Sequence, residues 1–550
     1  MPPGERHSAI IIRTTPPGIT EPQPHLNTAE TTLESEPRLP LSSQEAQFRS
    51  RVGQISRHST VFFAGSMFTA AAGYLFKVYV ARVLGADGLG IYALGMTLVG
   101  FLGIFNGLGL PQAAIRFVAS YSATAQWQRL HDFLRKISIL LFGANAALAF
   151  VVVFAGPWLA SHVYHAPELV RYLPYFAALL ALGGLSTFCG QILAGYKDVA
   201  IRTVVTNFIG SPLNIVIGVI ALSAGFALRG YLLGQVGSGV VVLLLLLATV
   251  WKKTPPQARR SPRVALATES EVIWFSAAAL GVSFLEFLLA QTDKVLLGVF
   301  LDVREVGIYA VAATVVVFVP IVLQSVNQIF APSIADLHAR GEHALLGRLF
   351  QTLTKWVLGL TLPLAFVVMI YSKPIMLLFG PAFGEGWPVL IVGTIGQLIN
   401  AGVGSVGYLL LMSGNQNRLI RVQAMMAVFT IAVTLALVKP FGILGVASAA
   451  ALTNAGTNYL CLRQVRRTLR LSPYNRTYLY LVLPAAATFG VALTLKLALA
   501  QLQPQWLWIG IALILSYAAF IGLSLLFGLD DDDKMILSAV RARIRDAWSR

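Results

Sequence analysis

Two segments of this chain occur twice in related form. The stretch from Lys77 to Ala93 (KVYVARVLGADGLGIYA) returns as Lys294 to Ala310 (KVLLGVFLDVREVGIYA), with both Lys-Val pairs and both Gly-Ile-Tyr-Ala runs matching. At nearly the same offset, Gly195 to Arg202 (GYKDVAIR) is followed by Gly414 to Arg421 (GNQNRLIR). Two repeats in register predict a chain built from two related halves. In membrane transporters, substrate sites lie at the interface between such halves.

The composition is that of a chain embedded in lipid. Apolar residues make up 56% of the 550 residues, charged residues only 12%, and the mean hydropathy is +0.71. A bilayer core requires about 20 apolar residues per helical span. By that criterion the sequence predicts an all-α polytopic membrane protein with about fourteen transmembrane helices. The predicted spans begin near Thr60, Leu89, Ile137, Tyr172, Val204, Tyr231, Ile273, Val306, Trp356, Val389, Val422, Ile443, Leu479 and Leu507.

The basic residues predict the orientation, because Lys and Arg accumulate in cytoplasmic loops. Basic clusters follow the second, sixth and twelfth spans, at residues 129–136, 252–263 and 463–476. We therefore expect both termini to be cytoplasmic. Six spans per repeat leave both copies facing the same way. Two six-helix lobes should then be related by a pseudo-two-fold axis along the membrane normal, followed by two extra C-terminal helices.

The predicted domains follow from these spans and from the composition between them. Residues 1–58 are rich in Thr, Pro, Ser and Glu and are expected to form a disordered cytoplasmic tail. The other predicted parts are an N-lobe (59–251), a cytoplasmic linker (252–271), a C-lobe (272–475), the extra helix pair (476–528) and a cytoplasmic amphipathic tail (529–550). The last tail suits a helix on the inner membrane surface or one packed against a cytoplasmic loop.

Several functional classes find no support in the sequence. Nucleophile elbows, phosphate-binding Gly loops and zinc-protease motifs are not found, so we expect no catalytic residues and no enzyme. The pair His162 and His165 lacks companion ligands, so no metal site is expected. A net charge of +17 follows from the positive-inside bias and does not indicate nucleic-acid binding.

Distributed patterns over residues 55–530 resemble the polysaccharide-transport flippases, a branch of the multidrug/oligosaccharidyl-lipid/polysaccharide exporter superfamily. The resemblance rests on Gly90 to Ala119 (GIYALGMTLVGFLGIFNGLGLPQAAIRFVA), on Gly307 to Leu337 and on Leu410 to Leu462. A count of fourteen spans is similar to that of the lipid-linked-sugar flippases, whereas the drug exporters of the superfamily typically have twelve.

The resemblance implies a flippase that moves a polyprenyl-diphosphate-linked oligosaccharide from the cytoplasmic to the outer leaflet by alternating access. It implies a plasma membrane of a prokaryote, contacts with membrane lipids and with polysaccharide polymerase or assembly proteins, no cofactor, and coupling to H⁺ or Na⁺. The alternatives are a cation-coupled multidrug antiporter, a lipid II flippase, and a nontransporting scaffold. By resemblance to lipid II flippases, the extra helix pair would accommodate the lipid tail.

A diphosphate-sugar headgroup requires a polar, cationic cavity between the lobes. The candidate cations are Arg116, Lys77, its repeat partner Lys294, and Lys355. Arg116 is the strongest, because it lies in a segment that carries the resemblance and its planar fork suits a phosphate. Snorkelling to the membrane surface is the competing explanation for each of them.

Glu286 and Asp293 are seven residues apart in the predicted seventh span, which places them two turns apart on one face. Carboxylates within spans are costly and usually face a cavity or a partner. We therefore expect them to act in cation or proton coupling and gating. The alternative is a packing pair satisfied by Lys294 or by a neighbouring span.

Amide side chains inside the spans suit sugar hydroxyls, since they both donate and accept. Interhelical hydrogen bonding is their more common use. The predicted polar cavity residues are Asn106, Gln112, Asn327 and Asn400, with Asn207, Asn214, Gln324 and Gln328 as further amides in or near spans.

Overall fold

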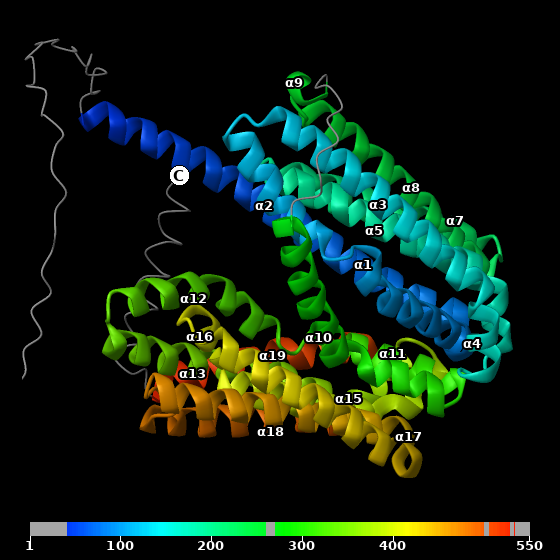
Figure 1. Ribbon diagram of the computed structural model, residues 1–550. Coiled ribbons are helices and arrows are strands. Elements are labelled where there is room, and N and C mark those ends of the chain that lie inside the picture. Colours follow the sequence, from blue (N-terminus) through cyan, green and yellow to red (C-terminus); the bar gives the residue numbers. More distant parts are fainter. Residues whose placement is uncertain (1–40, 260–269, 500–504, 528–532, 534–550) are drawn as a thin grey trace, which may run out of the picture. The chain divides into compact units, whose positions relative to one another are not determined.

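The computed structural model describes residues 41–259, 270–499, 505–527 and 533 (Figure 1). Within these ranges every regular element is a helix, so the predicted all-α class is confirmed. The contacts discussed below lie within the compact unit that begins at Ala64.

The first half of the chain forms eleven helical elements. They are α1 (Leu41–Asn106), α2 (Leu110–Ala123), α3 (Trp127–Phe154), α4 (Gly156–His162), the 3₁₀ turn η1 (Pro167–Tyr172), α5 (Leu173–Gly195), α6 (Val199–Thr203), the π-helix η2 (Val204–Gly210), α7 (Ser211–Ser223), α8 (Ala227–Lys253) and the short α9 (Pro256–Arg259). Helix α5 packs against α2, α3 and α8, and its buried side chains include Phe176 and Phe188.

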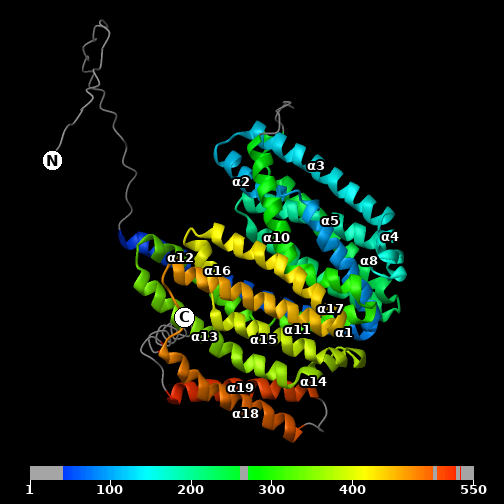
Figure 2. The ribbon, with the colours of Figure 1, turned by 60° about the horizontal axis from the view of Figure 1, so that its bottom comes forward.

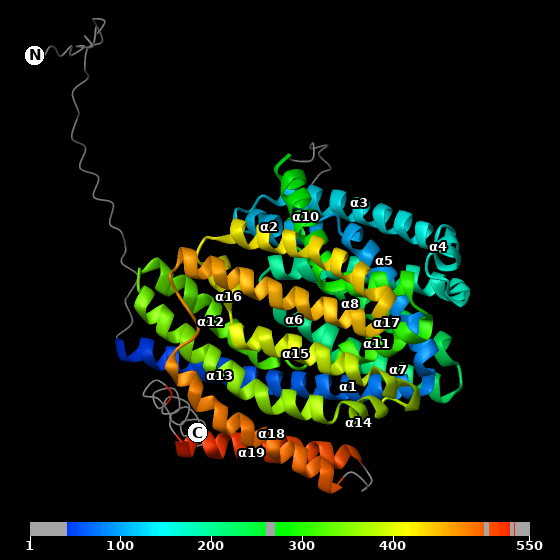
Figure 3. The same ribbon diagram turned by 90° about the horizontal axis from the view of Figure 1, so that it is seen from below.

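The second half repeats this organisation and adds a helix pair. Its elements are α10 (Ser270–Phe300), α11 (Val303–Val316), α12 (Ile321–Ala339), α13 (His343–Ile370), α14 (Ser372–Leu377), η3 (Pro381–Gly386), α15 (Trp387–Val403), α16 (Val406–Met412), α17 (Gln416–Thr468), η4 (Arg476–Leu481), α18 (Val482–Leu499) and α19 (Gln505–Phe527). Helix α15 packs between α13 and α17, while α18 and α19 pack on each other and against α13 (Figures 2 and 3).

Among the described residues, eleven helices are long and apolar enough to cross a membrane, or twelve if one bent pair counts as a single span. That pair, Val303–Val316 and Ile321–Gln328, bends by 49° just where Pro320 interrupts the apolar run. Helices α1 and α17 each contain one Gly with non-helical backbone angles, Gly85 (φ 68°) and Gly442 (φ 55°). The predicted number of fourteen counts each of these two helices as two spans, and it stays a prediction.

Two predicted boundaries differ from the observed helices. Helix α1 begins at Leu41, inside the predicted tail, because the Pro-rich composition ends at Pro40 and the following residues contain good helix formers. The predicted linker contains α9 and the start of α10; α8 ends at Lys253, just before the Pro255-Pro256 pair. Residues 1–40, 260–269 and most of the C-terminal tail lie outside the described residues.

Helix α10 contacts elements of both halves. A side chain on Gly109, at the start of α2, would clash with the backbone of Ser276 in α10, so the two helices touch there. Further along, α10 packs extensively against α17 and also against α11. The two halves meet again at the repeated segments, where Gly90 of α1 lies against the backbone of Val303 of α11.

Candidate functional site: a polar cavity in the C-lobe

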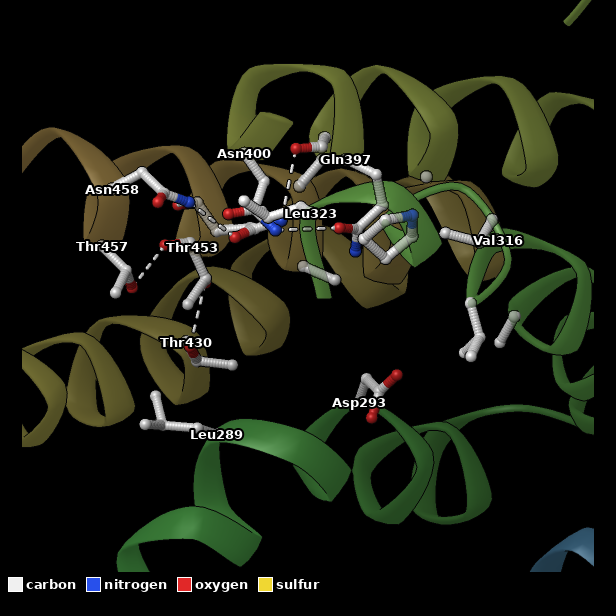
Figure 4. A pocket seen from close by; sticks show the side chains of 18 of the residues that line it. Leu289, Asp293, Val316, Leu323, Gln397, Asn400, Thr430, Thr453, Thr457 and Asn458 are labelled. Atoms are coloured by element: carbon white, nitrogen blue, oxygen red, sulfur yellow. Dashed lines mark hydrogen bonds between the residues drawn. The ribbon is translucent and has the colours of Figure 1, made fainter. Parts of the chain in front are cut away.

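A cavity of about 660 Å³ lies within the second half of the chain. Its walls come from α10, α11, α12, α15, α16 and α17 (Figure 4). The walls combine small or aliphatic residues, such as Gly393, Ala447 and Ala451, with hydroxyl and amide side chains. Gly396 and Ala451 approach so closely that a Cβ on Gly396 would lie 3.0 Å from the Cα of Ala451, which holds α15 tightly against α17.

The α17 wall carries two Thr-Asn pairs one helical turn apart, Thr453-Asn454 and Thr457-Asn458. Asn458 Nδ2 donates to Asn454 O (2.9 Å) and to Asn454 Oδ1 (3.0 Å). Thr430 Oγ1 donates to Thr453 Oγ1 (2.9 Å), and this bond joins the parts of α17 before and after its break at Gly442. These side chains form a polar strip inside an otherwise apolar span (Figure 4).

The facing wall is built from α12, α15 and the start of α16. Asn400 Nδ2 donates to Gln397 Oε1 (3.2 Å), and Ser405 Oγ donates to Asn327 Oδ1. Asn454 Nδ2 donates across to Gly396 O (3.2 Å), so the polar strip of α17 is fixed to α15. These bonds, within α15 and between helices, orient the amides and leave their remaining donors and acceptors available to a solute.

Asp293 of α10 closes the cavity opposite these amides (Figure 4). Tyr309 Oη of α11 donates to Asp293 Oδ2 at 2.7 Å. The other carboxylate oxygen, Oδ1, is buried and has no hydrogen-bond partner among the described residues. The neighbouring Lys294 donates to Gln291 Oε1 of its own helix (2.7 Å). A buried carboxylate oxygen without a partner favours a cation or a proton.

The structure brings four of the predicted site residues to this cavity and leaves six outside it. Asp293, Lys294, Asn327 and Asn400 line it, together with Gln324. Glu286, Lys77 and Gln112 are exposed and do not line it. The remaining three, Asn106, Arg116 and Lys355, have other contacts.

Lys355 of α13 is buried in an ion pair. Its Nζ lies 2.6 Å from Asp533 Oδ2, with side-chain exposures of only 7% and 5%. The other oxygen of Asp533 accepts from Trp356 Nε1 at 2.9 Å. This Lys is therefore already neutralised by a carboxylate 178 residues away, which is a structural use of the charge.

Arg116 and Asn106 also make contacts within the protein. The Arg116 guanidinium lies 5.4 Å from the ring centre of Phe117 and 5.1 Å from that of Phe275 in α10, so it helps join α2 to α10. Asn106 Nδ2 donates to Leu180 O (3.3 Å), and the backbone carbonyl of Asn106 accepts from Asn145 Nδ2 (3.0 Å). Asn106 thus serves interhelical bonding, the use that competed with sugar recognition.

Sequence reasoning did not select Gln397, Asn454, Asn458 or Tyr309 as site residues. The signal for the α17 residues was present, because the dipeptide Thr-Asn recurs after four residues and so returns to the same helix face. Tyr309 belongs to the second Gly-Ile-Tyr-Ala run, whose repetition indicates duplication but does not indicate which of its side chains faces a cavity.

The chain is similar to two curated proteins whose names refer to succinoglycan transport and to glycan biosynthesis. It is 26% identical over 322 residues to the succinoglycan biosynthesis transport protein ExoT of Rhizobium meliloti, covering 56% of this chain and 60% of that protein. It is 22% identical over 405 residues to a probable low-salt glycan biosynthesis flippase of Haloferax volcanii, covering 73% and 81% of the two chains. The match thus spans less than two thirds of the succinoglycan protein's length.

Solved structures share the fold at low sequence identity. The lipid II flippase MurJ, in an inward closed conformation, superposes with a TM-score of 0.70 at 13% identity, covering 85% of this chain and 98% of that one. An inward-facing multidrug resistance transporter of the MATE family has a TM-score of 0.58 at 14% identity, covering 72% and 94%.

These likenesses, with the many apolar helices, make the chain a multi-pass membrane protein. The family model described as "Polysaccharide biosynthesis protein" matches residues 55–338, more than half of the chain. The chain belongs to the polysaccharide biosynthesis protein family.

Proposed function

We propose that this protein is a flippase that moves a polyprenyl-diphosphate-linked oligosaccharide from the cytoplasmic to the outer leaflet, for export of a cell-surface polysaccharide. The observation that carries the proposal is a cavity lined by amides and hydroxyls inside a lobe of a polysaccharide biosynthesis protein. Both curated relatives carry names of glycan transport. Translocation makes and breaks no covalent bond, so we assign the chain no catalytic step.

The cavity has the chemistry that a sugar requires. Amide and hydroxyl groups both donate and accept, which matches the hydroxyls of a saccharide. Lys294 is the one basic side chain among the described residues that line the cavity, so it is the candidate contact for the diphosphate. The polyprenyl tail has no need to leave the lipid, since only the headgroup is costly to move through hydrocarbon.

We further propose that Asp293 couples transport to H⁺ or Na⁺. Its Oδ1 atom is buried and has no partner in the described part of the chain, while Tyr309 holds the other oxygen in place. Binding of a cation would remove the cost of this buried charge and change the packing of α10 against α11 and α17. Glu286, two turns earlier, is exposed and is a weaker candidate for that role.

The same proposal includes the cellular setting. The basic clusters at 129–136, 252–263 and 463–476 support cytoplasmic termini. The relatives from Rhizobium meliloti and Haloferax volcanii support the plasma membrane of a prokaryote. A chain that delivers lipid-linked oligosaccharide to the outer leaflet hands it to the enzymes that polymerise it, so polymerase and assembly proteins are the expected partners.

The test is transbilayer movement of a polyprenyl-diphosphate oligosaccharide in liposomes that contain the purified full chain. Movement is scored by cleavage of the sugar with an external glycosidase. We expect movement that rises with protein content and falls in Asp293→Asn and Lys294→Met. Absence of movement for several glycans would contradict the flippase. If cation-linked efflux of a small dye accompanied that failure, the antiporter would replace it; movement of lipid II alone would make the chain a lipid II flippase.

A further inference from the structure

A second cavity, of about 110 Å³, lies where α18 and α19 meet the junction of α13 and α14. Leu495, Leu499 and Pro374 form its apolar walls. Its volume is several times the roughly 30 Å³ that one water molecule occupies in the liquid. The cavity is therefore large enough for a small polar group and too small for an oligosaccharide.

Two hydrogen-bond donors around this cavity have no acceptor among the described residues. Tyr371 is only 5% exposed, and its Oη has no partner among the described residues. Trp508 Nε1 is also buried without a partner in the same part of the chain. Buried polar groups without partners are rare and destabilising. Burial also raises the pKa of Tyr371, which keeps this hydroxyl protonated. Both donors line the cavity, so they favour an acceptor that the described residues do not supply.

Lys496 adds a positive charge at the same place. Its Nζ donates to Ile370 O at 2.6 Å, which engages one of the three N–H groups of the ammonium. Gln505, the first residue of α19, also lines the cavity, and a helix N-terminus presents N–H groups without intrahelical partners. Acidic residues do not occur among the described residues that line the cavity. Charge and donors together favour an anion.

The cavity lies at one end of a transmembrane helix. Helix α18 follows the Arg-rich segment 463–476 and has 18 residues, which corresponds to about 27 Å, close to the thickness of a bilayer core. Lys496 lies in its last turn, at the end opposite the basic segment. Trp506, beside the cavity in sequence, is 61% exposed, and Trp is enriched at membrane interfaces. The cavity is thus at headgroup depth, on the outer side in the predicted orientation.

We propose that the cavity between Tyr371, Lys496 and Trp508 binds the phosphate of a lipid headgroup in the outer leaflet. The ammonium and the two donors contact phosphate oxygens, and the leucines contact the first carbons of the lipid. This site is separate from the C-lobe cavity and does not depend on the proposed transport activity. The lipid is either an anionic phospholipid or a polyprenyl phosphate, and the shared chemistry is the phosphate.

The experiment measures retained lipid by native mass spectrometry of the full chain, titrated with phosphatidylglycerol, with diacylglycerol as its phosphate-free match, and with polyprenyl phosphate against polyprenol. We expect the phosphate-bearing member of each pair to be retained preferentially. Lys496→Met should weaken that retention by roughly tenfold, the usual effect of losing a charge-assisted hydrogen bond. Lys373→Met is the matched control, because Lys373 is exposed, near Tyr371 in sequence, and does not line the cavity.

Tyr371→Phe separates binding from folding. Because the hydroxyl has no partner in the described chain, its removal should leave the melting temperature of the lipid-free protein unchanged or raised, while phosphate-lipid retention falls several-fold. A preference for polyprenyl phosphate over phosphatidylglycerol identifies the lipid carrier as the source, equal retention identifies phospholipid in general, and displacement of both by inorganic phosphate identifies the phosphate alone. Equal retention of phosphate-free lipids, an unchanged Lys496→Met protein, or an equal loss in Lys373→Met would overturn the site.

Discussion

Gly90 and Gly307 occupy equivalent positions of the two repeats, and each packs against the helix that contains the other. A Cβ on Gly90 would be 1.8 Å from Val303 O, and a Cβ on Gly307 would be 2.0 Å from Ala86 O. Ala86 and Val303 are themselves equivalent positions, four residues before the respective glycines. The contact therefore repeats itself when the two halves are exchanged, as contacts on a two-fold axis do. The duplicated sequence has become a symmetric contact between the halves.

Gly307→Ala should separate the two halves at this point. The added carbon meets the backbone of Ala86, which cannot rotate away as a side chain can, and such overpacking typically costs about 1–3 kcal/mol. We expect a lower melting temperature in detergent and slower transport. Gly143→Ala in α3 is the matched control, because its Cβ would meet nothing within 4 Å. Equal melting temperatures for Gly307→Ala and the wild type would show that the halves do not rely on this contact.

The Lys355–Asp533 pair should behave as a buried ion pair. Lys355→Met removes the cation that faces the buried Asp533 carboxylate, and breaking such a pair costs about 3–5 kcal/mol. The double variant Lys355→Met/Asp533→Leu should recover most of this loss. Arg340→Ala, which breaks an exposed pair with Asp336, should have an effect of about 0–1 kcal/mol. Thermal unfolding of the wild type, Lys355→Met, the double variant and Arg340→Ala measures these terms, and a double variant no more stable than Lys355→Met would contradict the pairing.

Asp293→Asn should stop cation-dependent transport while the fold persists. The amide oxygen still accepts from Tyr309, so the contact between α10 and α11 is kept, but the negative charge is lost. Transport should fall at least tenfold and lose its dependence on an H⁺ or Na⁺ gradient. Glu286→Gln, at an exposed position on the same helix that does not line the cavity, is the comparison and should reduce transport less than Asp293→Asn. A gradient dependence that survived in Asp293→Asn would assign coupling to another group.

Thr457→Val tests the polar strip of α17. Valine has the same shape, and the lost hydroxyl donates to Thr453 O of its own helix, its one hydrogen bond among the described residues, so stability should change little. One hydrogen bond to a sugar hydroxyl is worth about 1 kcal/mol, so the apparent KM for the oligosaccharide should rise about fivefold. Thr494→Val in α18, an exposed hydroxyl with the same intrahelical bond, is the control. An unchanged KM would place the sugar away from α17.

The sequence predicted the helical architecture well, because apolar runs and their interruptions are local. The breaks at Gly85, Pro320 and Gly442 each fall where one predicted span gives way to the next or where a proline interrupts a span. The partners of charges were not predictable in this way. Lys355 is paired with Asp533, 178 residues later, and no periodicity links two such positions.

The residues of the polar cavity were predictable only in part, because the sequence reveals polar residues in apolar spans but not the partners of those residues. Asp293 and Asn400 were selected because single polar residues stand out in apolar spans. Arg116 was selected on charge and resemblance, yet it lies by Phe275 of α10, a contact that only the packing of α2 on α10 reveals. Which face of each helix meets its neighbour decides whether an amide lines a cavity or, like Asn106, bonds to a backbone.

Helix α10 is attached at its beginning to α2 and over its later part to α17. If the halves tilt against each other, this one rod of 31 residues must flex, and Gly281, around which a Cβ would meet nothing, lies near its middle. In such a motion the bending stiffness of α10 contributes to the energy of the conformational change. Residues of α10 that contact neither substrate nor ion can therefore change the rate of that motion.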